Sequence, residues 1–439
     1  MKVNFHLFLT ANYKKRIKNK KYEIRNNSMN IIFLTKYFPP DSIGGGEISA
    51  YYLALGLAGK GHQITVMKKG KKDRDYHESK NLKILERRNL FNKEVPNFER
   101  HWAKKQAQIL LQDIPRDTRI IHSHDFHSAL IGAELKKIVP GRPLFIATVR
   151  DYWPVCGYGK VKMNGEVCPG CKSFRDFKDC PKVVGGNLIQ KYLRMWRYHY
   201  NIPQRQESLK QFDEVIYISR ALRDEIKKSR NIFFPFFTEK VIYNPIPLEA
   251  ENYTSGSNGE GKTILFAGLL DLHKGVEFLL KALGKVASKT DFQCILAGTG
   301  PLFGQYKKMA KYLRIEDRVN FLGAIPYRLM PDLYRKADLV VMPSIWPEPF
   351  GRTALEGMAY GKAVVATRHG APQEFIQNNE TGILIEPGNV LELAERIIFL
   401  LQNPDERRRI GENARKYVLE KFHPAKIAEE YEKVYQYNE

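Results

Sequence analysis

The sequence predicts an α/β fold made of two doubly wound domains, each built on a parallel sheet. Short apolar runs alternate with helix-like segments along most of the chain, which is typical of parallel strands joined by crossover helices. The alternation is interrupted by a polar stretch rich in Gly, Ser and Asn, Thr254–Gly259, and then starts again. A length of 439 residues suits two or three domains.

The first domain is expected over residues 29–245, where apolar runs of strand length recur between helix patterns. One helix is expected over Ile48–Gly59, after three glycines, and another over Ala221–Lys228. The expected strands are Met29–Thr35, Gly61–Val66, Arg119–Asp125, Pro143–Val149, Glu214–Ser219 and Lys240–Tyr243.

Residues 1–28 differ from the rest of the chain, with eight Lys and Arg and one acidic residue. They do not follow a secretory pattern, because Lys14–Lys21 come after the short apolar run instead of before it. Two interpretations stay open. Either the natural start is Met29, or residues 1–28 form a loosely ordered basic extension.

A linker is expected over residues 246–261 and the second domain over residues 262–423. The last segment, residues 424–439, is expected to be helical. The expected strands of the second domain are Thr263–Ala267, Phe292–Ala297, Val319–Leu322, Leu339–Met342 and Ala363–Ala366.

The stretch after Leu339–Met342 carries the strongest functional pattern. A loop with two prolines and Gly351 follows this buried strand, and a helix signal begins at Thr353. Ligands bind at such loops in open α/β sheets, and a helix amino terminus there attracts phosphate. Glu348 lies in the loop and Glu356 about one turn into the helix. Carboxylates only accept hydrogen bonds, so they suit the vicinal hydroxyls of a sugar or ribose.

This block, together with Gly361–Thr367, Gly370 and Glu374, resembles the signature of glycosyltransferase family 4. The resemblance extends from about Met29 to the C-terminus. It implies the GT-B fold, in which two Rossmann-like domains face each other across a cleft and the final helix crosses back to the first domain. It also implies a retaining enzyme that moves a sugar from a nucleoside-diphosphate sugar to a hydroxyl of a glycan or lipid-linked acceptor, without an obligatory metal cofactor.

The resemblance also assigns roles to residues. Glu356 should hold the ribose diol, and Glu348 the transferred sugar. The glycine loop after the first strand should lie against the donor diphosphate. The implied donor-binding residues are Gly45, Gly46, Lys274, Glu348, Phe350, Gly351, Arg352, Thr353 and Glu356, and the implied catalytic residues are Glu348, Arg150 and Lys274.

The sequence departs from the family pattern near Lys274. A cation there would offset the charge that grows on the leaving nucleotide. Many members have a second cation, an Arg, where this chain has Leu269. His273 or Arg352 are the residues that could replace it.

Arg150 is a second departure, because many members have a His after the corresponding strand. An Arg cannot act as a base at neutral pH. It could donate to a sugar hydroxyl or bind an acceptor phosphate through two hydrogen bonds. The alternative is a structural ion pair with Asp151 or Asp125.

An insert over residues 156–180 contains four cysteines in the pattern C-x11-C-x2-C-x8-C. Four thiolates at such spacing can close a tetrahedral structural zinc site. Two disulfides with three possible connectivities, or simply reduced thiols, are the alternatives. An insert after Asp151-Tyr152-Trp153 resembles a subgroup of the family. The predicted zinc ligands are Cys156, Cys168, Cys171 and Cys180.

Positive charge is concentrated in the first half of the chain. Residues 1–261 hold 46 Lys and Arg against 26 Asp and Glu, a net charge of +20, whereas residues 262–439 have +3. This favours an acidic partner such as an anionic membrane surface or a phosphorylated lipid carrier. Leu188–Arg205 could form an amphipathic helix on a membrane, or could pack on its own domain. We therefore expect a cytoplasmic protein, peripheral at the inner face of the membrane.

Two other function classes stay open at this point. A sugar-nucleotide epimerase or a phosphorylase could share the two-domain architecture, since a fold does not fix a function. The charge and the cysteines also fit a basic, zinc-containing nucleic-acid-binding protein. That class leaves Glu348 and Glu356 unexplained, so no nucleic-acid partner is expected.

Overall fold

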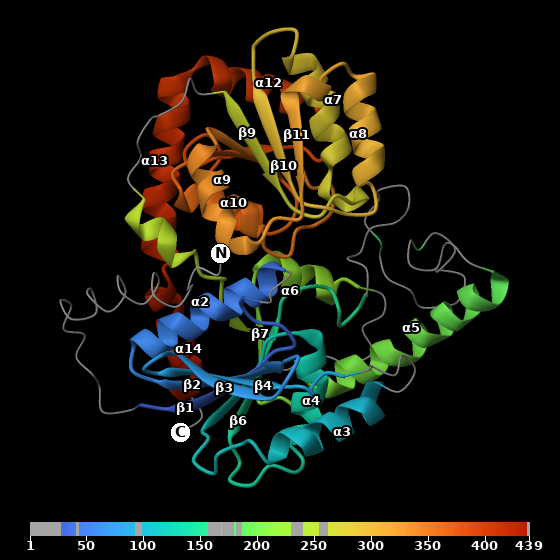
Figure 1. Cartoon of the computed structure of the whole chain (residues 1–439), viewed down its shortest axis with the longest axis vertical. Coiled ribbons are helices and arrows are strands. Elements are labelled where there is room, and N and C mark those ends of the chain that lie inside the picture. Colours follow the sequence, from blue (N-terminus) through green and yellow to red (C-terminus); the bar gives the residue numbers. More distant parts are fainter. Residues whose placement is uncertain are drawn as a thin grey trace.

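The computed structural model contains two α/β domains, one above the other, each with helices on both faces of its sheet (Figure 1). The predicted fold class is confirmed. The structure describes residues 28–40, 44–92, 99–156, 168, 180, 187–229, 240–253 and 262–436.

The first sheet has the strand order β3-β4-β2-β1-β5-β6-β7-β8. All neighbours are parallel except β3, which pairs antiparallel with β4 at the sheet edge. Neither β3 nor β4 is among the strands expected from the sequence. The strand bounds are β1 Asn30–Leu34, β2 Gln63–Lys69, β3 Arg74–Ser79, β4 Leu82–Arg87, β5 Ile120–Ser123, β6 Leu144–Val149, β7 Glu214–Tyr217 and β8 Lys240–Val241.

The second sheet is parallel throughout, in the order β11-β10-β9-β12-β13-β14. Its central strands are buried on both faces, which explains why they read as continuous apolar runs. The strand bounds are β9 Thr263–Ala267, β10 Gln293–Ala297, β11 Val319–Gly323, β12 Leu339–Met342, β13 Ala363–Thr367 and β14 Ile383–Ile385.

Side chains of β1 alternate between two layers of the first domain. Ile31 and Phe33 pack with residues of α2 and α14, whereas Ile32 and Leu34 join the core on the other face. The α-helices are α2 Gly45–Gly59, α3 Glu99–Leu111, α4 Phe126–Leu135, α5 Leu188–Leu209, α6 Arg220–Lys227, α7 Val276–Val286, α8 Phe303–Tyr312, α9 Met330–Lys336, α10 Arg352–Ala359, α11 Pro372–Phe375, α12 Val390–Gln402, α13 Pro404–Lys421 and α14 Pro424–Gln436; short 3-10 turns are η2 Leu248–Asn252, η3 Leu272–Lys274, η4 Glu316–Arg318 and η5 Tyr327–Leu329.

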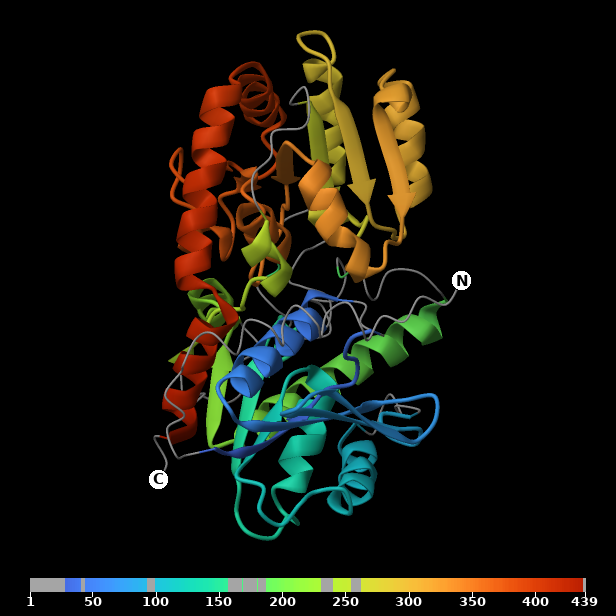
Figure 2. The same cartoon turned by 60° about the vertical axis from the view of Figure 1, so that its left-hand side comes forward.

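The last two helices connect the domains. Figure 2 shows α13 running along the second domain and α14 continuing along the first. Gly56 of α2 allows this close packing, because a Cβ there would lie 2.5 Å from the carbonyl oxygen of Pro424. The chain passes between the domains twice, and the two crossings touch where the backbone N–H of Ile246 donates to the carbonyl of Phe422 (2.9 Å).

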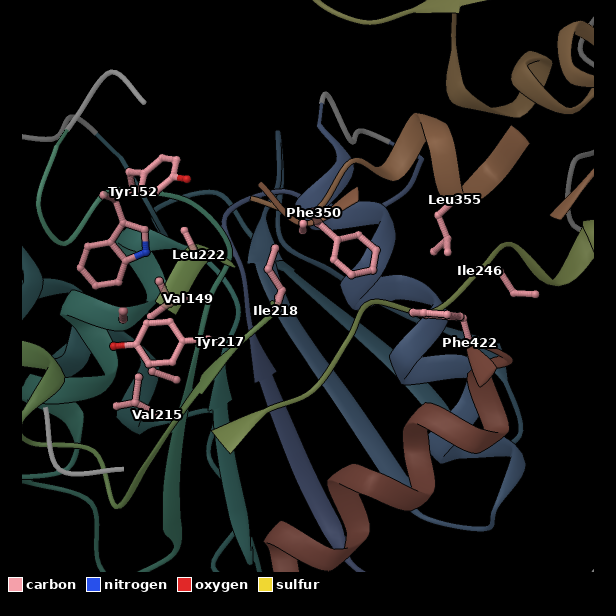
Figure 3. Packing of buried hydrophobic residues seen from close by; sticks show 14 of the residues in the cluster. Val149, Tyr152, Val215, Tyr217, Ile218, Leu222, Ile246, Phe350, Leu355 and Phe422 are labelled. Carbon is pink, nitrogen blue, oxygen red and sulfur yellow. The ribbon is translucent and has the colours of Figure 1, made fainter. Parts of the chain in front are cut away.

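An apolar cluster continues across the domain junction (Figure 3). The ring of Phe350, from the loop before α10, lies near those of Tyr243, Phe375 and Phe422, with ring centroids 5.6–6.5 Å apart. Tyr243 follows β8 of the first domain, whereas Phe350 belongs to the second. Their contact makes the apolar cores of the two domains continuous. Among the helices of the described residues, none has the length and apolar character needed to cross a bilayer.

Candidate functional site

The loop between β12 and α10 lies at the domain junction. It ends at Gly351, whose φ of 85° is a left-handed conformation that favours glycine. A Cβ at Gly351 would also lie 3.0 Å from the terminal methyl of Met342. Helix α10 begins directly after this turn, and no side chain caps its first amides. The hydroxyl of Thr353 donates to the carbonyl of Ala267 at the end of β9 (2.9 Å), which ties the two strand ends together.

Glu348 is 4% exposed and has two charged or polar donors. The ammonium of Lys274 and the hydroxyl of Ser344 each donate to its Oε1, both at 2.6 Å. Burial raises the pKa of Glu348, but Lys274 and the hydrogen bonds lower it by more, so the carboxyl stays ionised. Gly370 makes room for this arrangement, because a Cβ there would lie 2.3 Å from the backbone nitrogen of Glu348.

Lys274 reaches Glu348 from a different strand end. It closes η3, after β9, and the next residue, Gly275, again has a left-handed φ of 70°. A Cβ at Gly275 would lie 1.8 Å from the carbonyl oxygen of Pro343, so only glycine lets the two loops approach this closely. The ammonium of Lys274 also lies 4.7 Å from the ring centroid of Trp346, a cation–π contact. Leu269, in the position of the missing second cation, is 46% exposed.

Glu356 is also buried, with 4% of its surface exposed, and its neighbours include an arginine and a tyrosine. Arg352 pairs with it at 2.6 Å, and the hydroxyl of Tyr327 donates to it at 2.8 Å. The same guanidinium donates to Ser49 Oγ (3.0 Å) and to the carbonyl of Pro245 (3.3 Å), both outside the second domain. Arg352 therefore connects the carboxylate predicted to hold ribose with the helix that follows the glycine loop.

The glycine loop meets two of the predicted site arginines. A Cβ at Gly45 would lie 3.1 Å from Cδ of Arg352, and one at Gly46 would lie 3.3 Å from Cδ of Arg150. Both glycines stand at the amino terminus of α2, where backbone N–H groups lack partners within the helix. The structure thus brings these four residues, predicted from distant parts of the sequence, to one place.

Arg150 follows β6 and donates to the side-chain oxygen of Asn244 (2.5 Å) and contacts Nδ1 of His124 (3.0 Å). The two carboxylates considered as its partners are engaged elsewhere. Asp125 caps α4 through the amide of Ser128, and Asp151 accepts from the amide of Trp153. Arg150 is thus held by neutral groups and not by a direct ion pair with either carboxylate.

Two buried histidines, His122 and His124, lie beside Arg150, with ring centroids 3.9 Å apart and ring planes tilted by 36°. Burial lowers the pKa of both His122 and His124 well below the usual range, so both are neutral. His122 bonds to Tyr435 of α14 (2.8 Å) and to Thr148 of β6 (2.7 Å). These contacts support the strand ends from inside the domain.

Several residues that make contacts at the junction were not among the predicted site residues. Burial raises the pKa of Glu47, which follows the three glycines and lies near Arg150. Tyr152 donates to the carbonyl of Pro347 (2.6 Å), so the first domain holds the loop that carries Glu348. Glu374 accepts from the backbone N–H groups of Arg220 (3.0 Å) and Ala221 (2.6 Å) at the start of α6. Tyr152 and Glu374 stand in sequence blocks that resemble the family pattern, but their contacts across the junction could not be read from the sequence.

Three of the four predicted zinc ligands lie among the described residues. Cys156, Cys168 and Cys180 are described, whereas Cys171 lies outside the described residues. Within the described ranges, no group of three or more His, Cys, Asp or Glu side chains could hold a metal ion. The four-cysteine zinc site stays a prediction.

Comparisons with known proteins agree on one enzyme class. Residues 43–250 match the family model described as Glycosyltransferase Family 4, and residues 249–417 match Glycosyl transferases group 1. An uncharacterized glycosyltransferase of Methanocaldococcus jannaschii is 29% identical over 93% of this chain and 98% of its own length. The N-acetyl-alpha-D-glucosaminyl L-malate synthase of Bacillus anthracis is 32% identical over 52% of this chain and 60% of its length.

Solved structures show the same fold. Sucrose-phosphate synthase from Thermosynechococcus elongatus superposes with a TM-score of 0.71 at 19% identity, covering 93% of this chain and 98% of that one. Anabaena HepE, solved in complex with UDP-glucose, gives a TM-score of 0.64 at 20% identity over 92% and 99%.

Proposed function

The chain is a glycosyltransferase of the family 4 type, and from this premise we propose that it transfers a sugar, with retention of configuration, from a nucleoside-diphosphate sugar to a hydroxyl of a glycan or lipid-linked acceptor. The observation that carries the proposal is the buried Glu348–Lys274 pair beside the open amino terminus of α10. Glu348 can accept hydrogen bonds from sugar hydroxyls, Lys274 supplies a positive charge, and the first amides of α10 can donate to a phosphate. The UDP-glucose complex of HepE supports a nucleotide donor.

In this proposal the donor lies on the second domain. The first amides of α10 bind the distal phosphate, because they lack intrahelical partners and carry the positive end of the helix dipole. Lys274 neutralises the diphosphate as the bond to the sugar breaks. Glu348 accepts hydrogen bonds from the sugar hydroxyls, and its lowered pKa keeps it an acceptor at neutral pH.

Ribose binding at Glu356 involves Arg352. The ribose hydroxyls take over hydrogen-bonding positions on the carboxylate that Arg352 and Tyr327 occupy in this structure. Arg352 then turns toward the diphosphate and supplies the second cation that Leu269 cannot provide. The same movement breaks its bonds to Ser49 and Pro245, so donor binding loosens one link between the domains.

The acceptor lies on the first domain, near Arg150 and the glycine loop. Its hydroxyl oxygen forms a bond to the anomeric carbon on the face from which the diphosphate leaves, the carbon–oxygen bond to the diphosphate breaks, and the proton passes to the leaving phosphate. Arg150 cannot take this proton. Its part is to orient the acceptor through hydrogen bonds, and positioning with charge stabilisation accounts for the rate.

A panel of sugar nucleotides tests the donor. A donor at 100 times its Kd should stabilise the protein by about 2.7 kcal/mol, which raises the Tm by about 3 °C if the 439 residues unfold together. Turnover with glycan and lipid-linked acceptors follows, and NMR of the product gives its anomeric configuration. Retention supports the proposal, and inversion refutes it. Conversion of the donor into an epimer without acceptor would instead identify the epimerase alternative.

A further inference from the structure

Helix α5 is firmly attached to the first domain at its C-terminal end. The carboxylate of Glu99, on α3, is fully buried and receives two hydrogen bonds from Arg205, at 3.0 and 2.8 Å, and one from Asn201 at 3.0 Å. The guanidinium of Arg205 also lies 4.2 Å from the ring centroid of Phe126. A bidentate, buried pair of this kind fixes the direction of the helix.

The other end of α5 carries an exposed apolar stripe. It consists of Ile189, Tyr192, Leu193, Trp196 and Tyr200, whose exposed fractions are 70, 57, 56, 44 and 47%. At about 100° per residue, all five lie within an arc of about 100° on one face of the helix. The rings of Trp196 and Tyr200 are stacked, with centroids 5.3 Å apart.

The stripe contains an unusually high share of the exposed large hydrophobic side chains. Eleven large hydrophobic side chains are exposed in the described part of the chain, and five of them belong to these twelve residues. Figures 1 and 2 both show this end of α5 extending away from the first domain. Contiguous exposed apolar surface at a projecting end is typical of an interaction site.

The charge around the stripe indicates the kind of partner. Residues 187–200 include Lys191 and Arg194 and no acidic residue. Residues 29–261 as a whole have a net charge of +13. An apolar, aromatic face with basic neighbours fits an anionic lipid surface, where Trp and Tyr rings settle at the headgroup level.

The length of the stripe fits a helix that lies in the surface. From Ile189 to Tyr200 the helix rises about 16 Å, roughly half the thickness of the hydrocarbon core of a bilayer. Such a stripe can enter the boundary between headgroups and acyl chains along its whole length.

We propose that the stripe on α5 inserts into an anionic membrane surface and holds the first domain against it. The Glu99–Arg205 anchor transmits this attachment to the domain on which the acceptor is proposed to bind. The proposal does not depend on the donor assignment, because lipid binding is measured without sugar transfer.

Co-sedimentation of the full chain tests the proposal, with vesicles of phosphatidylcholine alone and of phosphatidylcholine with phosphatidylglycerol. We expect binding to the anionic vesicles at low salt and weaker binding at high salt. The double variant W196S/Y200S should bind at least tenfold more weakly. The matched control, Y312S/F399S, removes two exposed aromatic side chains of the second domain and should bind as the unchanged protein does.

Tryptophan fluorescence supplies a second measurement. Trp196 is 44% exposed, whereas Trp102, Trp153 and Trp346 are at most 9% exposed. Insertion should therefore shift the emission to shorter wavelength and protect mainly Trp196 from acrylamide. Unchanged emission on bound vesicles would mean attraction by charge alone and would overturn the insertion. Equal binding of W196S/Y200S would overturn it too. Self-association that this double variant abolishes, without vesicle binding, would show that the stripe joins two copies of the chain.

Discussion

Replacing Lys274 by Met removes the ammonium that pairs with Glu348 and keeps a side chain of similar length. Glu348 is 4% exposed, and the pair is 2.6 Å long. Removing one partner of a buried ion pair costs about 3–5 kcal/mol, because the other charge stays buried without its counter-ion. The side chain of Lys274 is 22% exposed, so we expect the lower end, about 3 kcal/mol of unfolding free energy.

Lys281→Met is the matched control. Lys281 pairs with Glu277 at the same distance, 2.6 Å, but the two side chains are 45 and 34% exposed. Exposed pairs of this kind contribute about 0.3–0.5 kcal/mol. The two pairs have the same length, so the difference between the two variants reports mainly the burial of the pair that contains Glu348.

The effect of Lys274→Met should depend on pH with a definite sign. In the unchanged protein the pKa of Glu348 is lowered, so its stabilisation is present above the unfolded pKa of about 4.3 and is lost as pH falls through the folded value. Without Lys274, burial dominates and the folded pKa lies above the unfolded one. The buried charge then destabilises at neutral pH, and protonation removes that cost on acidification.

Urea denaturation at several pH values between 4 and 7.5 is the assay. The loss caused by Lys274→Met should be largest at pH 7.5 and should shrink toward pH 4. Adding Glu348→Gln to Lys274→Met should recover most of the loss at pH 7.5, because no buried charge remains. A loss that does not vary with pH, or no recovery in the double variant, would refute the reasoning.

Three further outcomes are expected. Glu356→Ala should weaken donor binding in titration calorimetry more than it lowers kcat, and unchanged donor affinity would remove Glu356 from the ribose site. Glu374→Gln leaves one acceptor oxygen and places the amide NH2 against one of the two N–H groups of Arg220 and Ala221, so the domain contact should weaken by about 1–3 kcal/mol; an unchanged radius of gyration in small-angle X-ray scattering would contradict this. Elemental analysis should find one zinc per chain, lost when Cys168 and Cys171 are replaced by Ser, and two disulfides without zinc would overturn the site.

The fold was predictable wherever strands are buried on both faces. Leu339–Met342 is a continuous apolar run because helices cover both sides of the second sheet. Strands β3 and β4 were missed because β3 lies at the edge and is dominated by polar and charged residues. Its charges are satisfied across the hairpin, where Arg74 pairs with Glu86 and Arg87 with Asp75. Such pairs appear only once the strands are adjacent.

The residue types of the site were readable from the sequence, but their partners were not. The loop and helix start pointed to Glu348 and Glu356. The cation of Glu348 comes from a distant part of the chain, because Lys274 lies 74 positions earlier, whereas Arg352 binds Glu356 from one turn earlier in the same helix. Arg150 shows the limit most clearly, because its partner Asn244 is 94 positions away and was not considered. Partners that lie far apart in the chain and meet only through tertiary packing leave no periodic pattern in a sequence.

The contact between Ile246 and Phe422 limits how the two domains can move. The chain crosses the junction twice, and both crossings meet at this hydrogen bond. Any opening of the domains must therefore pivot about one point at the edge of the junction, which favours a rotation over a sliding motion. The arrangement also means that the domains cannot be separated by one cut. Removing residues after 423 would deprive the first domain of α14 and uncover the apolar side of α2. An isolated first domain would have to be made as two fragments, with α14 supplied as a peptide or fused through a new loop.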